Sequence, residues 1–124
     1  MTQRTTYARG SVVFADLEPV VGVEQGRERP CVVVSDLETV RRSRARAIYT
    51  VVPLTRSDVL TGPLAPRLNK RQGGLSADST ALVMHVRSIA PERISARIRG
   101  TLNDNELQKV QLGLVALLGL EAVS

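Results

Sequence analysis

The chain has 124 residues, of which 43% are hydrophobic and 23% are charged, with a net charge of +5. This length and composition predict one globular domain over residues 1–124, with residues 1–9 expected to be flexible, and exclude a two-domain enzyme and a disordered chain. Apolar runs of four residues or so fall far short of the roughly 20 that a membrane helix needs, and no signal leader opens the chain, so we expect a cytoplasmic protein without membrane contact.

Glycine and proline residues recur every eight to twelve residues and divide the chain into short apolar segments. Segments of this length that are enriched in Val, Ile, Leu and Thr are typical of strands. Leu37–Arg44 predicts a short helix with a narrow apolar stripe. The pattern therefore predicts a small β barrel or sandwich. The expected strands are Ser11–Leu17, Cys31–Asp36, Ala45–Pro53, Pro63–Leu68, Ser79–His85 and Ser95–Leu102.

The end of the chain changes to a helical period. Residues 103–106, Asn-Asp-Asn-Glu, fit a helix start in which an Asn side chain caps the first turn and the Glu reaches back. Gly119 can end this helix. Gly113 inside it costs about 1 kcal/mol relative to alanine, which indicates close packing against a strand or a partner. The apolar stripe expected to face the barrel is Leu107, Val110, Leu114 and Leu117.

Positive charge is concentrated in the middle of the chain. Residues 41–99 hold 12 basic and 3 acidic residues, a net charge of +9, whereas the two flanks together carry −4. Such a segment suits a polyanion, because the release of counterions from a phosphate backbone favours binding. The alternative is a solvated surface, since 15 of the 17 basic residues are arginine and a coding bias or solubility would also account for them. Few aromatic residues are present for base stacking, so recognition is expected to use polar edges and loops.

The residue inventory excludes several kinds of catalytic site. His85 is the only histidine and Cys31 the only cysteine, which excludes a two-histidine acid–base pair, an internal disulfide and a thiolate zinc site. Phosphate-binding and dinucleotide-binding glycine motifs are absent, and Gly73-Gly74 is typical of a tight turn. The carboxylates are dispersed, with no pair spaced like a magnesium cluster. We therefore expect no cofactor, no metal site, and metal-independent chemistry if the protein is a nuclease.

A polar, glycine-hinged loop over residues 22–30 leads directly into the apolar strand that begins at Cys31. Pro30 restricts the backbone of Arg29 to an extended conformation, so the guanidinium is aimed, and its planar donors suit two oxygens of one phosphate. The alternative interpretation is a surface loop whose acidic and basic residues pair with one another, since exposed ion pairs are common. A second polar segment, residues 54–58, follows the third expected strand and taken alone is typical of a turn.

Together these segments resemble the MazF/PemK family of toxin endoribonucleases, and the likeness covers most of the chain. The loop motif Gly-x-Glu-Gln-x-x-x-Arg-Pro is its most specific part. The resemblance implies a mainly β, SH3-like barrel of the PemK/CcdB-like kind with a C-terminal helix. It also implies a homodimer that acts as an mRNA interferase, cleaving single-stranded RNA at short sequences without metal, and an acidic MazE-like antitoxin as partner. The matching segments are Gly10–Leu17, Pro19–Pro30, Cys31–Ser35, Val52–Thr55 and His85–Ile89.

The resemblance also implies roles for individual residues. Arg29 and Thr55 carry over as the catalytic pair, and Glu24 is a candidate general base. His85 departs from the pattern, because this chain has an imidazole where the family usually has an amide, so the cleavage-site preference does not carry over and a role in proton transfer stays open. The residues expected to contact RNA are Gln25, Arg27, Arg56, Ser57, His85 and Arg87.

These residues fit a reaction in which the 2′-hydroxyl of RNA attacks the adjacent phosphorus and leaves a 2′,3′-cyclic phosphate and a free 5′-hydroxyl. Arg29 is suited to stabilise the extra negative charge on phosphorus, because an arginine side chain stays protonated. Thr55 would orient a phosphate oxygen or the attacking hydroxyl. A CcdB-like gyrase poison and a noncatalytic binding barrel remain alternatives, because a fold alone does not fix a function.

Overall fold

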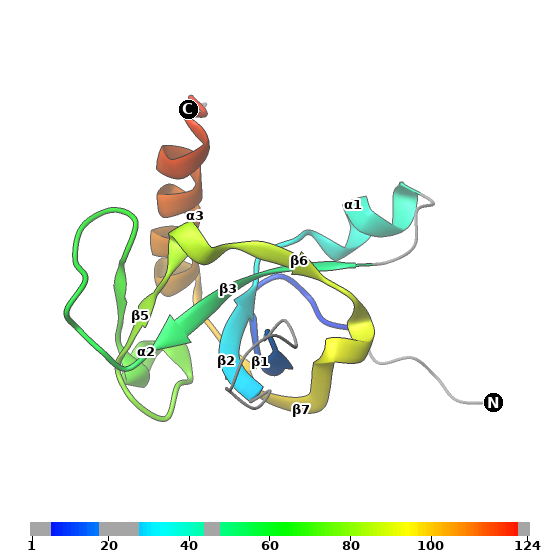
Figure 1. The fold of residues 1–124 in the computed structure, drawn as a ribbon, viewed down its shortest axis with the longest axis horizontal. Coiled ribbons are helices and arrows are strands. Elements are labelled where there is room, and N and C mark those ends of the chain that lie inside the picture. The colour runs from blue at the N-terminus through cyan, green and yellow to red at the C-terminus, as the bar shows by residue number, and fades with distance from the viewer. Residues whose placement is uncertain (1–5, 18–27, 44–47, 122–124) are drawn as a thin grey trace, which may run out of the picture.

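The computed structural model describes residues 6–17, 28–43 and 48–121. The strands in these residues are β1 Ser11–Asp16, β2 Glu28–Val33, β3 Tyr49–Thr55, β4 Arg67–Leu68, β5 Ser79–Ala81, β6 Arg87–Ile89 and β7 Ile94–Thr101. They form a curled antiparallel sheet in the order β4-β5-β3-β2-β1-β7, and β6 pairs with β3 beside this path (Figure 1).

Helices connect the strands. The α-helices of the described residues are α1 Leu37–Arg42, α2 Lys70–Gly73 and α3 Asp104–Leu118, and the short 3₁₀ turns are η1 Val83–His85 and η2 Pro91–Arg93. α1 and α3 pack against different core clusters of the sheet. α3 stands against the sheet at the end of the chain (Figure 1). The prediction of a mainly β, barrel-like fold with a C-terminal helix is therefore confirmed. Within the described part of the chain, no helix combines the length and the apolar character needed to cross a membrane.

The central strands are buried on both faces. Neighbouring residues of β1 enter different clusters, because successive side chains of a strand point to opposite faces. Val13 packs with Tyr49 of β3 in the first cluster, and Val12 packs with Val110 of α3 in the second cluster. Burial on both faces explains why these strands are almost continuous apolar runs.

The observed N-cap, end and buried face of α3 match the sequence prediction. Glu106, however, does not reach back to the helix start, because its buried carboxylate accepts hydrogen bonds from the Asn69 N–H at 2.9 Å and from Lys109 Nζ at 3.0 Å. The Asn103 side chain accepts a hydrogen bond from the N–H of Glu106 at 2.9 Å, and Gly119 ends the helix with φ of 68°. A Cβ added at Gly113 would lie 2.8 Å from the carbonyl oxygen of Pro63 and 2.9 Å from the side chain of Val83. The predicted close packing is therefore with other parts of the same chain. The predicted stripe packs on the second cluster through Leu107, Val110, Leu114 and Leu117.

Several short elements differ from the sequence prediction. The expected strand from Pro63 is reduced to Arg67–Leu68, because Gly62, Pro63 and Pro66 favour a turn before it. The expected strand Ser79–His85 ends at Ala81 and continues as η1. β6 was not expected at all. Gly73-Gly74 is the end of the short helix α2, with Gly74 in the left-handed conformation at φ of 68°.

Two other boundaries differ at the start of the sheet. β2 begins three positions before the expected Cys31, because Glu28 already pairs with Asp16 of β1. It ends at Val33, before the expected Asp36. Asp36 instead caps α1: its carboxylate accepts hydrogen bonds from the Thr39 hydroxyl at 2.6 Å and the Thr39 N–H at 3.1 Å. These two bonds lower the pKa of Asp36.

Tyr7 lies in the first core cluster, within the segment 1–9 that was expected to be flexible. Its N–H donates to the Tyr49 hydroxyl at 3.3 Å, and its own hydroxyl donates to the Ser95 carbonyl at 3.0 Å. The two tyrosine rings meet edge to face, with centroids 5.4 Å apart. Burial and the neighbouring Tyr49 raise the pKa of Tyr7. Tyr7 therefore ties the start of the described chain to the sheet.

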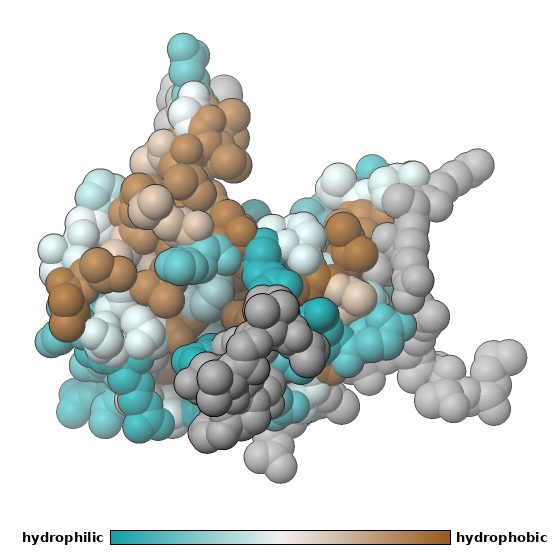
Figure 2. Space-filling model, viewed as in Figure 1, coloured by the Kyte–Doolittle hydropathy of each residue, from teal (hydrophilic) through white to brown (hydrophobic). Residues whose placement is uncertain are grey.

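Apolar side chains also lie on the surface. Figure 2 shows them along α3 and over the loop that follows β3. We call the set of large exposed apolar residues in these two places and in η1 the apolar surface group. Its members are Val59, Leu60, Met84, Leu112, Leu118 and Leu120.

Candidate active site

Arg29 and Thr55, the predicted catalytic pair, come together where β2 begins and β3 ends. Cys31 of β2 is the partner of Pro53 of β3 in their antiparallel register. Arg29 lies two residues before Cys31 and Thr55 lies two residues after Pro53, so both residues flank the same end of this pairing. The pairing of two strands thus joins two residues that are far apart in the sequence.

Both residues line a pocket of about 240 Å³. The lining combines an apolar part, hydroxyl groups and guanidinium groups. Its residues are Phe14, Pro30, Leu54 and Leu75, then Thr55, Ser76 and Ser79, and finally Arg29, Arg56 and Arg99. No carboxylate occurs among these residues of the described chain. The pocket is therefore positively charged, which suits the phosphates of a nucleic acid.

The loop after Thr55 is held by side-chain hydrogen bonds. Thr55 Oγ1 accepts from the N–H of Ser57 at 3.2 Å. Arg67 of β4 donates through Nη1 to the carbonyl oxygens of Arg56 and Ser57, at 3.0 and 3.1 Å. The same nitrogen donates to Oγ1 of the buried Thr80 at 2.9 Å, and this hydroxyl donates to the Ser57 carbonyl at 2.9 Å. This network fixes the backbone that carries Thr55 and Arg56 at the pocket.

A stacked pair stands at the same pocket. The guanidinium carbon of Arg99, on β7, lies 4.5 Å from the centroid of the Phe14 ring on β1. Arg99 Nη1 also donates to Ser76 Oγ. The sequence prediction of the site missed Phe14, Ser76, Ser79 and Arg99. The signals available for two of them were general, because Phe14 is one of few aromatic residues and Arg99 belongs to the basic segment.

The other residues expected to bind RNA have different positions. Arg56 lines the pocket, and Ser57 is exposed on the adjoining loop. Arg87 is half-buried on β6, where its Nη1 donates to the carbonyl oxygen of Leu17. It therefore holds the chain at the last described residue before the predicted loop. Glu24, Gln25 and Arg27 lie outside the described residues.

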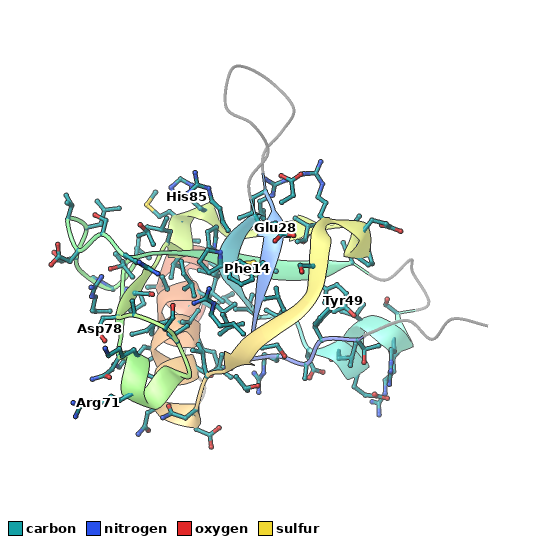
Figure 3. All side chains as sticks on the ribbon, turned by 90° about the horizontal axis from the view of Figure 1, so that it is seen from below. Phe14, Glu28, Tyr49, Arg71, Asp78 and His85 are labelled. Atoms are coloured by element: carbon teal, nitrogen blue, oxygen red, sulfur yellow. The ribbon has the colours of Figure 1, made fainter. Side chains whose placement is uncertain are left out.

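His85 is exposed in η1 and lines another pocket. This second pocket has a volume of about 300 Å³ and is mainly apolar, with Leu60, Leu64 and Met84 in its wall. In Figure 3, Phe14 on β1 and His85 on η1 are separated. The structure thus does not bring His85 into the pocket of Arg29 and Thr55.

The chemistry of the Arg29 pocket comes from its arginines and hydroxyls. Across residues 6–17, 28–43 and 48–121, no group of three or more His, Cys, Asp or Glu side chains could hold a metal ion. Cys31 is fully buried, and burial raises the pKa of its thiol to about 12, so it is no nucleophile near neutral pH. The pocket can bind a phosphodiester, orient it and stabilise added negative charge.

Relatives of this chain are found among curated proteins. Endoribonuclease MazF9 of Mycobacterium tuberculosis is 35% identical over 114 residues, which cover 90% of this chain and 96% of that protein. Endoribonuclease EndoA of Bacillus subtilis is 32% identical over 112 residues, which cover 90% of this chain and 94% of that protein. Both relatives therefore match this chain over nearly their whole length.

A solved structure has the same fold. The crystal structure of MazE-MazF (Form-II) from Deinococcus radiodurans matches with a TM-score of 0.72 at 24% identity, covering 93% of this chain and 97% of that chain. Residues 8–118 also match the sequence model of a family described as PemK-like, MazF-like toxin of type II toxin-antitoxin system. The resemblance seen in the sequence is thereby confirmed. The chain belongs to this family of PemK-like, MazF-like toxins.

Proposed function

We propose that the protein is an endoribonuclease that cleaves single-stranded RNA, mRNA included, at short sequences and without a metal ion. The observation that carries the proposal is the convergence of Arg29 and Thr55 in one positively charged pocket. Family membership and relatives named as endoribonucleases support the same activity.

In the proposed reaction the 2′-oxygen attacks the adjacent phosphorus, and the bond from phosphorus to the 5′-oxygen breaks. The 2′-hydroxyl loses its proton to a base, and the departing 5′-oxygen gains one, which leaves a 2′,3′-cyclic phosphate and a 5′-hydroxyl. Arg29 donates to the nonbridging oxygens and stabilises the charge that develops on them. Thr55 orients one of these oxygens or the attacking hydroxyl. Arg56 adds positive charge at the loop.

The base in this reaction stays a hypothesis. The lining residues contribute guanidinium and hydroxyl groups, which are poor proton acceptors near neutral pH. Glu24, the candidate base from the family motif, belongs to residues 18–27, outside the described chain. Metal independence is proposed on the donor chemistry of the sequence, in which one histidine and dispersed carboxylates offer few ligands for a divalent ion.

We also propose an acidic MazE-like antitoxin segment as the inhibitor of this pocket. Three guanidinium groups in the lining would attract the carboxylates of such a segment. A segment bound there would block Arg29 directly. The crystal structure of MazE-MazF described above supports this assignment by analogy.

A homodimer in the cytoplasm completes the proposal. The apolar surface group offers a second copy the kind of surface that dimers bury. Val59 is 82% exposed and Met84 is 68% exposed in the single chain, so covering their apolar surface in a dimer would be favourable in free energy.

The test is cleavage of a long single-stranded transcript by the purified protein in excess EDTA, with analysis of the product ends. Products with a 2′,3′-cyclic phosphate and a 5′-hydroxyl are expected. Arg29→Ala protein prepared in parallel controls for contaminating nucleases. Cleavage that depends strictly on added magnesium would contradict the proposed reaction, and binding without cleavage would favour the noncatalytic barrel.

A further inference from the structure

The pair of Arg99 and Phe14 has no role in the cleavage step described above. The two residues come from neighbouring strands, because β7 pairs with β1. Their side chains meet at the pocket that also holds Arg29 and Thr55. Arg99 is exposed, so its position owes little to burial. A long, exposed arginine that is nevertheless placed at the pocket calls for a physical reason.

Two contacts give Arg99 a defined position. Its guanidinium carbon lies 4.5 Å from the centroid of the Phe14 ring, where the cation is attracted to the face of the ring. Its Nη1 donates to Ser76 Oγ. Fixing an arginine side chain costs rotamer entropy, and these contacts offset part of that cost before any ligand arrives. A ligand of Arg99 therefore meets a side chain that is already ordered.

The same contacts determine what Arg99 can bind. One face of the guanidinium is covered by the ring, and one nitrogen is engaged with Ser76. The remaining N–H donors lie in the plane of the group, where they match two oxygens of a phosphate. A single aromatic ring that already carries a cation is not a free platform for a base. The geometry therefore favours a phosphate over a nucleobase as the ligand.

We propose that Arg99, ordered by Phe14 and Ser76, forms a second phosphate subsite that binds the RNA phosphate next to the scissile one. The inference rests on the proposed cleavage of RNA at Arg29 and Thr55. One pocket joins both sets of groups, and consecutive nucleotides each carry one phosphate, so the ligand of Arg99 is an immediate neighbour along the strand. Arg99 thereby sets which phosphodiester bond lies at Arg29.

The competing explanation is that Arg99 only ties β7 to β1 and to the segment of Ser76. Such a tie would affect stability, but it would not sense the charge of one particular phosphate. The distinction can be measured with RNA in which a single phosphate is replaced by an uncharged methylphosphonate. The oligonucleotide is centred on a site that the wild-type protein selects in a long transcript, and the phosphate on either side of that site is neutralised in turn.

The variant is Arg99→Met, which keeps a long side chain and removes the charge. On the unmodified oligonucleotide we expect KM to rise about tenfold with little change in kcat, since a charge-assisted hydrogen bond is worth about 1.5 kcal/mol or more. For wild-type protein, one of the two neutral substrates raises KM by a similar factor. For Arg99→Met, that substrate causes no further loss. Arg71→Met, an exposed arginine of α2 outside the pocket lining, is the matched control and should behave like wild type.

Two further variants test the ordering of Arg99. Phe14→Leu keeps an apolar side chain but removes the aromatic face, and should raise KM toward the value of Arg99→Met. Arg99→Lys keeps the charge but not the planar donors, and should fall between wild type and Arg99→Met. The inference is overturned if the KM of Arg99→Met equals that of the Arg71→Met control. It is also overturned if each of the two neutral substrates raises the KM of Arg99→Met by the same factor as it raises the KM of the wild-type protein.

A binding measurement separates this inference from the proposed function. A pool of randomised 12-nucleotide 2′-O-methyl RNAs cannot be cleaved by 2′-hydroxyl attack, so affinity for the pool is independent of catalysis. Arg99→Met should bind the pool more weakly, with a log-log salt slope smaller by about 0.7, the value for one phosphate contact on a single strand. If Arg99→Met binds the pool more weakly in this way but the wild-type protein cleaves no RNA, the phosphate subsite is supported and the proposed function is overturned. Unchanged affinity and slope would overturn the subsite whatever the cleavage activity.

Discussion

In the proposed reaction, Arg29 acts through the geometry of its side chain as much as through its charge. Its backbone is fixed by pairing with Ala15 of β1 and by the proline that follows it. A guanidinium held in this way can present two parallel donors to one phosphate, whereas an ammonium acts as a point charge. The identity of the side chain should therefore matter more than its charge.

Substitutions of Arg29 test this statement. Arg29→Ala should lower the single-turnover cleavage rate by about 100 to 1,000-fold, the typical loss when one preorganised donor is removed. Arg29→Lys should recover only a small part of that loss. Thermal unfolding of each variant serves as the control for folding, because an exposed strand-end residue contributes little to the core. Cleavage by Arg29→Ala at nearly the wild-type rate would remove Arg29 from the catalytic assignment.

Cys31 shows the opposite environment, a polar group enclosed by apolar neighbours. Its pKa is about 12 in the folded state, against an ordinary value of 9.0. Because the folded pKa is the higher one, the stability contribution of the protonated thiol is complete below pH 9 and is lost as pH rises toward 12. Between pH 9 and pH 10 the loss should be about 1 kcal/mol. Urea unfolding of the wild-type protein and of Cys31→Val at both pH values measures this loss of unfolding free energy. An equal loss in the two proteins would contradict the buried thiol.

Only part of the pocket could be predicted from the sequence. Arg29, Thr55 and Arg56 belong to two local motifs, and each motif is readable in a few consecutive residues. Phe14, Ser76, Ser79 and Arg99 reach the pocket because of strand pairing and of the turn after α2, which no local pattern specifies. Conversely, His85 begins one of the segments that resemble the family, but in the structure it lines the second pocket together with Leu60 and Met84.

The elements that were predicted well are those whose own residues determine them. α3 has a cap, a strong apolar stripe and a terminal glycine, so its bounds follow from local signals. β6 has three residues and exists because β3 supplies its hydrogen-bond partners. A short element of this kind depends on tertiary contacts that a sequence pattern does not contain.

Gly113 links α3 to the rest of the fold and provides a test at this scale. Gly113→Ala would gain about 1 kcal/mol of helix propensity. It would also press the new methyl group against the Pro63 carbonyl oxygen and the Val83 side chain, and such overpacking costs about 1–3 kcal/mol. We therefore expect the variant to be less stable than wild type in urea unfolding. Gln108→Ala, on the exposed side of α3, is the control and should change stability by no more than about 0.5 kcal/mol. A stabilised Gly113→Ala would contradict the packing described for α3.

The whole molecule carries two contrasting surfaces, a positively charged pocket and the apolar surface group. The first suits RNA or an acidic segment, and the second suits a copy of the same chain. Met84 is the most informative member of the apolar group, because it is 68% exposed and lies in the wall of the second pocket. A charge placed there would be costly to bury in a dimer.

Sedimentation equilibrium tests the proposed dimer. The wild-type protein should sediment with twice its chain mass of 13.5 kDa at micromolar concentration. Met84→Glu should shift the equilibrium toward the single chain, whereas Asn105→Glu, which adds the same charge outside the apolar surface group, should not. A wild-type species near 13.5 kDa that cleaves RNA at full rate would contradict an obligate dimer.

The central claim is that the pocket of Arg29 and Thr55 cleaves RNA through the 2′-hydroxyl beside the scissile phosphate. Its most direct test is a DNA oligonucleotide with a single ribonucleotide at the cleavage position, incubated with protein in excess EDTA. The wild-type protein should cut it only on the 3′ side of that ribonucleotide, and Arg29→Ala should leave it intact. Cutting of the all-DNA oligonucleotide, or cutting at any other position of the chimera, would contradict the claim.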